Sequence, residues 1–63
     1  MDCELVGRVL KKYQGDLEQA LRAVMQPPCA WIAVRGICEM FAKCLKMDEA
    51  ELLRMARKIR RNG

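Results

Sequence analysis

The stretch that decides the fold runs from Ala30 to Lys46 and reads AWIAVRGICEMFAKCLK. Apart from one glycine, its polar residues stand four or three positions apart, at Arg35, Glu39, Lys43 and Lys46. On a helix this spacing makes one narrow polar stripe and leaves the remaining surface apolar nearly all round. The pattern therefore predicts a mostly buried helix at the centre of the domain, with the rest of the chain as its amphipathic cover.

Apolar residues at helical spacing continue on the N-terminal side of this stretch. They predict a first helix with Asp2 as its N-cap, closed by Gly15 in a left-handed conformation. Asp16 then opens a second helix, in which Gln19 completes a capping-box pattern. The pair Pro27-Pro28 cannot continue a helix but suits the first turn of the next one, so the second helix ends before it and the third begins there.

A fourth helix is predicted after the central stretch, because Asp48 and Glu51 form another capping-box pattern and apolar residues recur behind them. The predicted fold class is therefore all-α: one small domain over residues 1–63, with four short helices in a compact bundle and the third helix central. We expect the helices at about residues 2–13, 16–26, 28–46 and 48–61.

Three residues of the central helix carry specific expectations. Phe41 lies on its apolar side and should be a core residue. Trp31 is expected to cover one end of the core, in preference to serving as a stacking platform for nucleic-acid bases. Gly36 costs a helix interior about 1 kcal/mol relative to alanine, so it either marks a close approach to another helix, at Gly7, or is a surface position without a packing role.

The composition limits the possible partners. Of 63 residues, 52% are hydrophobic, and a domain this small has too little interior to cover so many apolar side chains. We expect some to stay exposed, Met and Leu residues among them, where a second copy or a partner protein would cover them. The net charge of +4 mildly favours acidic partners such as nucleic acid, although a charged coat explains it equally well.

The cysteines are interpreted as packing residues. Cys3, Cys29, Cys38 and Cys44 contain no C-x-x-C pair, and the chain has no histidine. Structural zinc sites use closely spaced ligand pairs. We therefore expect four small buried hydrophobic residues and no metal or cofactor, with a zinc site or a disulfide as the alternatives.

The sequence also predicts the location of the protein in the cell. The sequence shows neither a membrane span nor an N-terminal apolar signal segment, which predicts a cytoplasmic protein with reduced thiols and no membrane partner.

The residue inventory argues against catalysis. Histidine, serine and threonine are all missing, and no glycine-rich phosphate loop is present. Cys29 is the one candidate nucleophile, so we expect a protein that is not an enzyme and has no evident small-molecule substrate. The candidate binding residues are four cations at i, i+3, i+4 and i+7 spacing, one side of the fourth helix, where arginines can contact successive nucleic-acid phosphates. They are Arg54, Arg57, Lys58 and Arg61.

Two segments resemble known families. Residues 32–57, especially FAKCLKMDEAELL at 41–53, resemble the last two helices of Xre-type helix-turn-helix repressors, which share an apolar-Ala-Lys-x-Leu-x-x-Asp-x-x-x-Leu rhythm. These are scaffold helices of that family, and the chain has no room for its base-reading helix pair. Residues 4–21, ELVGRVLKKYQGDLEQAL, are similar to the second and third helices of CUE and UBA ubiquitin-binding domains, without their first helix and its loop.

Two functions are consistent with these observations. The first is a small DNA-associated regulatory protein, a role that the Xre resemblance implies. Its cationic fourth helix would be the binding surface. The alternative is a protein-interaction module, homodimeric or CUE/UBA-like, that does not bind nucleic acid. Salt-dependent DNA binding would favour the first function, and a concentration-dependent mass without DNA affinity would favour the second.

Overall fold

The computed structural model of the protein describes residues 3–26 and 30–62. All regular structure in these ranges is helical: α1 (Cys3–Lys12), α2 (Leu17–Val24), α3 (Trp31–Leu45) and α4 (Glu49–Asn62). The predicted all-α fold of four helices is confirmed, with helix ends that agree to within a few residues. The predicted N-cap at Asp2 and the predicted start of the third helix at Pro28 lie outside the described residues.

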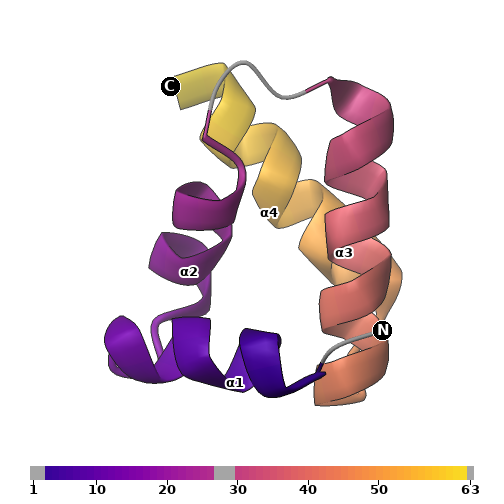
Figure 1. Cartoon of the computed structure of the whole chain (residues 1–63). Coiled ribbons are helices and arrows are strands. Elements are labelled where there is room, and N and C mark those ends of the chain that lie inside the picture. Colours follow the sequence, from indigo (N-terminus) through magenta and orange to yellow (C-terminus); the bar gives the residue numbers. More distant parts are fainter. Residues whose placement is uncertain (1–2, 27–29, 63) are drawn as a thin grey trace.

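The four helices form a ring of contacts around one core. α3 packs most extensively against α4, and α1 crosses the lower ends of the bundle, where it contacts α3 and α2 (Figure 1). α2 closes the ring by packing against α4. The main contacts of α3 are thus those with α4 and α1, in agreement with its predicted central place.

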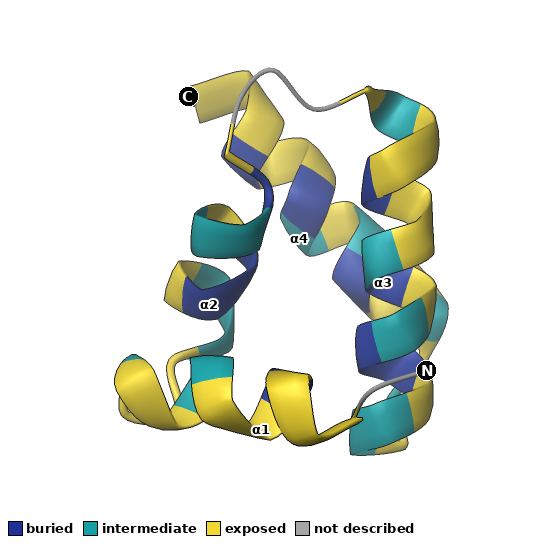
Figure 2. Ribbon diagram, viewed as in Figure 1, coloured by how far each residue is buried: buried dark blue, intermediate teal, exposed yellow. Residues whose placement is uncertain are grey.

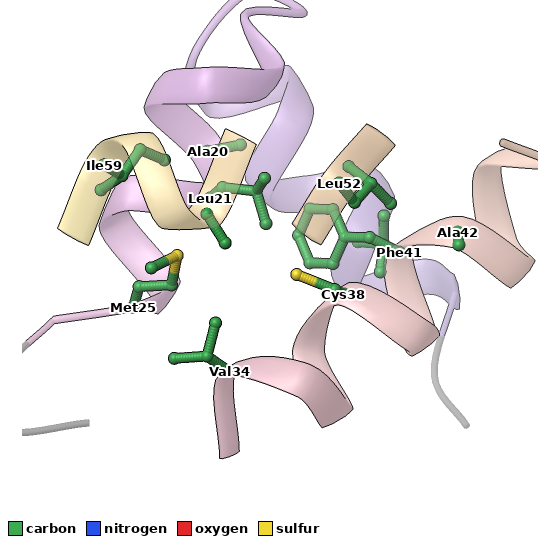
Figure 3. Close-up of a cluster of buried hydrophobic side chains, with 11 residues drawn as sticks. Ala20, Leu21, Met25, Val34, Cys38, Phe41, Ala42, Leu52 and Ile59 are labelled. Atoms are coloured by element: carbon green, nitrogen blue, oxygen red, sulfur yellow. The ribbon is translucent and has the colours of Figure 1, made fainter. Parts of the chain in front are cut away.

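The core is apolar throughout and draws on every helix. Phe41, Leu21 and Leu52, from three different helices, are each at most 1% exposed and point into one cluster (Figure 3). Its buried members are Val6, Ala20, Leu21, Met25, Val34, Cys38, Phe41, Ala42, Leu52, Ala56 and Ile59. The predicted core position of Phe41 is confirmed.

The composition of α3 predicts a helix that is buried on nearly every side. In the structure it is buried on one face only. Figure 2 shows that α3 has both buried and exposed residues along its length. Its buried residues are Val34, Cys38, Phe41 and Ala42, whereas Ile32 is 80% exposed. A Cβ atom built on Gly36 or Gly7 would meet nothing within 4 Å. Two interpretations of Gly36 were open, a close approach at Gly7 and a surface position without a packing role. The structure supports the second for both glycines.

The exposed apolar residues agree with expectation in part. Within the described ranges the large hydrophobic side chains that stay exposed are Leu5, at 47%, and Ile32. The methionines of these ranges do not supply this surface: Met25 is buried, and Met40, Met47 and Met55 pack partly buried against the core. Their unbranched side chains fill gaps at the core boundary.

The helix ends follow the capping chemistry of the sequence. Asp16 accepts a hydrogen bond from the Gln19 backbone N–H at 3.2 Å, which confirms it as the N-cap of α2. Asp48 accepts one from the Ala50 N–H at 3.1 Å. After α1, Gly15 has a φ of +81° and donates its N–H to the Leu10 carbonyl at 2.8 Å, the left-handed stop that was predicted.

A disulfide joins Cys3 at the start of α1 to Cys44 near the end of α3, with their Cα atoms 5.3 Å apart. The interpretation of these two cysteines as packing residues is wrong. Their separation of 41 positions leaves no local signature, and only the crossing of α1 over the end of α3 brings them together. Cys38 is free and buried, as predicted, and Cys29 lies outside the described residues.

None of the described helices is both long and apolar enough to cross a membrane. The cytoplasmic location stays a prediction. Its premise of reduced thiols does not hold for the Cys3–Cys44 pair, since disulfides are typical of oxidising compartments.

Candidate nucleic-acid interface

The four predicted cations project from one side of α4. Leu52, Ala56 and Ile59 are the buried residues of this helix, and they direct its opposite side to solvent. The exposed cations on that side are Arg54, Arg57, Lys58 and Arg61. The helix thus holds them as a group, on a face the core does not use.

These cations line an open groove of about 700 Å³ together with Trp31 and Arg60. We name this site the basic groove and define it by Trp31, Arg54, Arg57, Lys58, Arg60 and Arg61. It lies at the end of the molecule where α3 begins and α4 ends, away from α1 (Figure 1). Five of its six lining side chains are cationic, so the groove is suited to an anionic ligand.

Trp31 orients part of this charge. The guanidinium carbon of Arg57 lies 5.7 Å from the centroid of the indole ring, and that of Arg60 lies 5.4 Å from it. Both distances fit cation–π contacts. The ring itself is half-buried and packs against the core, which confirms the predicted covering role. Because two guanidinium groups already lie over the indole, we assign it the positioning of arginines and not the stacking of bases.

Sequence reasoning missed Arg60. Its spacing from Arg54 and Arg61 places it off the predicted cationic side, toward the flank of α4 that meets the start of α3. The signal available in the sequence was its i, i+3 relation to Arg57. Only the packing of α3 on α4 shows that both arginines share one tryptophan.

One carboxylate stands at the edge of the groove. The Lys58 ammonium lies 3.6 Å from one oxygen of Glu18 on α2, and the Arg22 guanidinium lies 3.7 Å from the other oxygen. Among the described residues, Glu18 is the carboxylate that comes within 4.0 Å of a cation of the groove. The four arginines of the groove have no such partner in that part of the chain, so their charge is available to a ligand.

A second set of cations lies on α1, away from the groove. Arg8 pairs with Glu4 at 2.9 Å, and the Lys12 ammonium lies 5.8 Å from the centroid of the Tyr13 ring. The cations Arg8, Lys11 and Lys12 are exposed, and none of them lines the basic groove. They provide a second cationic surface for comparison.

The remaining reactive groups of the described chain include one free cysteine, the buried Cys38. Burial raises the pKa of the Cys38 thiol, and the negative charge of Glu49 raises it further, so this thiol is poorly nucleophilic. The described residues contain no group of three or more His, Cys, Asp or Glu side chains that could hold a metal ion. The candidate nucleophile Cys29 lies outside the described residues.

Comparison with protein-family models, with characterised proteins and with solved structures gave no match to this chain. The resemblances to Xre-type repressors and to CUE and UBA domains therefore depend on the quoted segments alone.

Proposed function

We propose that the protein binds DNA through the basic groove and acts as a DNA-associated regulatory protein. The observation that carries this proposal is the gathering of five exposed cations and Trp31 in one groove, with Glu18 as their single carboxylate partner among the described residues. Like charges held this close repel one another, and the core gains nothing from them. A polyanion relieves that repulsion and releases its own counterions on binding.

The geometry favours contacts with the phosphate backbone over contacts with base edges. Arg54 and Arg61 are seven residues apart on α4, which corresponds to about 10 Å along the helix axis. That length corresponds to about three nucleotide steps of one strand, at roughly 3.4 Å of axial rise per nucleotide. Phosphate contacts position a protein on a duplex without reading its sequence. We therefore expect little preference among duplexes of different sequence.

The test compares two double variants that remove equal charge from different helices. Arg54→Gln with Arg61→Gln empties the ends of the groove, and Lys11→Gln with Lys12→Gln removes two cations from α1. Fluorescence anisotropy with a labelled duplex, at about 50 and 200 mM salt, gives the slope of log K against log salt. The groove variant should lower the magnitude of that slope by roughly two and the α1 variant should barely change it.

The groove variant should also remain folded. All four substituted side chains are exposed, so each change should stay within about 0.5 kcal/mol in free energy of unfolding. A wild-type protein without DNA affinity at low salt would refute the proposed function. Binding that depends on Lys11 and Lys12 would keep the function and refute the basic groove as its site.

The alternative function, a protein-interaction module, is favoured by one observation. Ile32 is 80% exposed on the outer face of α3, although single exposed hydrophobic residues are common on monomers. Sedimentation at several concentrations tests self-association directly. A mass that rises with concentration in wild type and not in Ile32→Asp would support this alternative.

A further inference from the structure

We infer that Glu18 occupies the position of a backbone phosphate, between Lys58 and Arg22, and that bound nucleic acid displaces it. This inference rests on the proposed function and extends the binding surface from α4 onto α2. Glu18 would then act as a built-in competitor that weakens binding. Its removal would expose a further phosphate contact.

The arrangement around Glu18 is that of one anion shared by two cations. One carboxylate oxygen faces the Lys58 ammonium of α4 at 3.6 Å, and the other faces the Arg22 guanidinium of α2 at 3.7 Å. A phosphate group also presents several oxygens and is bound by Arg and Lys side chains in the same way. Since Lys58 lines the basic groove, its contact with Glu18 links the groove to α2.

The carboxylate is held loosely enough to be replaced. Charge-assisted hydrogen bonds span about 2.7–2.9 Å, and Arg8 reaches Glu4 at 2.9 Å, whereas both contacts of Glu18 are longer. The side chains of Lys58 and Arg22 are 58% and 48% exposed, so a ligand can reach them. Such exposed pairs contribute little to stability.

Glu18 also keeps a favourable electrostatic environment after its displacement from the two cations. It lies in the first turn of α2, directly after the N-cap residue and the first residue of the helix. The positive end of the helix dipole favours a negative charge there whether or not the two cations are nearby. Displacement therefore does not leave the carboxylate without electrostatic support.

The test replaces Glu18 by glutamine and uses Glu39→Gln as a matched control. Glu39 also belongs to an i, i+4 pair, with Lys43 at 3.2 Å, but lies on α3 and does not line the groove. Both variants raise the net charge by one and keep the side-chain length. Their difference in duplex affinity therefore reports the local competition and not the overall charge.

We expect Glu18→Gln to bind duplex DNA more tightly than Glu39→Gln at low salt and to have a steeper salt dependence. Each added phosphate contact should increase the loss of affinity between about 50 and 200 mM salt by roughly 3-fold. Adding Arg22→Gln to Glu18→Gln should remove at least part of that increase. Circular dichroism of each variant checks that the helices are retained.

The outcomes separate this inference from the proposed function. If wild type binds DNA and Glu18→Gln behaves like Glu39→Gln, the inference is wrong and the function stands. If the gain in Glu18→Gln persists after Arg22→Gln is added, Arg22 is not part of the surface and the two-cation site is wrong. If neither wild type nor the variants bind at low salt, both proposals fail together with the groove.

Discussion

Loss of the Cys3–Cys44 disulfide should remove much of the stability of this domain. The bridge closes a loop with a sequence separation of 41 residues, and the chain-entropy relation assigns such a loop roughly 4 kcal/mol at 25 °C. A 63-residue domain has a total free energy of unfolding of about 3–9 kcal/mol. The cross-link is therefore comparable with the whole net stability of the folded chain.

The placement of the bridge makes α1 the most sensitive element. Val6 is the one fully buried residue among the described positions of α1, and Val9, Leu10 and Tyr13 pack against the core only in part. The disulfide fastens the first residue of this helix to α3. Without it, α1 should dock weakly and exchange its amide hydrogens faster than α4 does.

Cys3→Ser is the best perturbation, because Cys3 is exposed and its replacement leaves no cavity in the core. Urea unfolding followed by far-UV circular dichroism should show a decrease of about 2–5 kcal/mol relative to the oxidised wild type. The melting temperature should fall by roughly 10–30 °C. A reducing agent should destabilise wild type to a similar extent and leave Cys3→Ser unchanged.

Two results would contradict this reasoning. A Cys3→Ser variant that unfolds at the same urea concentration as oxidised wild type would show that the cross-link does not stabilise the fold. Peptide mapping of the unreduced protein that recovers Cys3 and Cys44 in separate peptides would show that the bridge does not form.

Two further predictions concern the core. Phe41→Ala should lower the free energy of unfolding by about 3–5 kcal/mol in urea titrations of the oxidised protein, because the ring is 1% exposed; an unchanged urea midpoint would place the ring outside the core. Burial raises the pKa of Cys38 above its ordinary value of 9.0. The unfolded chain therefore loses the thiol proton at a lower pH than the folded chain. The free energy of unfolding should fall as the pH rises from about 9 through the raised pKa. Cys38→Ala should lack this component of the pH dependence, and a variant with the same alkaline loss as wild type would refute the assignment.

The helices were predictable because their signals are local. Asp16 caps α2 through a hydrogen bond to a residue three positions away, and Gly15 ends the preceding turn through its own φ. The predicted core position of Phe41 needed only the apolar period of its helix. Such features depend on residues within one or two turns, which the sequence presents side by side.

Burial around α3 was harder to predict, because a short chain cannot surround a helix. Composition made this helix apolar on most sides, yet its neighbours α4 and α1 cover only one part of its surface and leave Ile32 in solvent. Gly36 was open to two interpretations for the same reason. Whether a glycine meets another helix depends on which face the helix turns inward, and periodicity alone does not fix that.

In the candidate site, too, the sequence predicts the features that arise within one helix and not those that join different helices. The cations of α4 were predictable as a group because helical spacing alone places them on one side. The disulfide, the contacts of Trp31 with Arg57 and Arg60, and the link from Glu18 to Lys58 were not, since each joins residues from different helices. Through these contacts the charged face of α4 becomes part of a groove that Trp31 lines and Glu18 borders.

The disulfide and the groove occupy opposite ends of α3, which has a consequence for how they are coupled. Trp31 is the first residue of this helix, and Cys44 lies 13 positions later, about 20 Å along the axis. The groove takes its residues from α3 and α4, and its proposed extension from α2, with none from α1. Reduction should therefore affect nucleic-acid binding through the stability of the bundle and not through the groove geometry. Any reduced protein that stays folded should keep the salt slope of the oxidised form, since that slope counts phosphate contacts and the proposed binding surface includes no residue of α1.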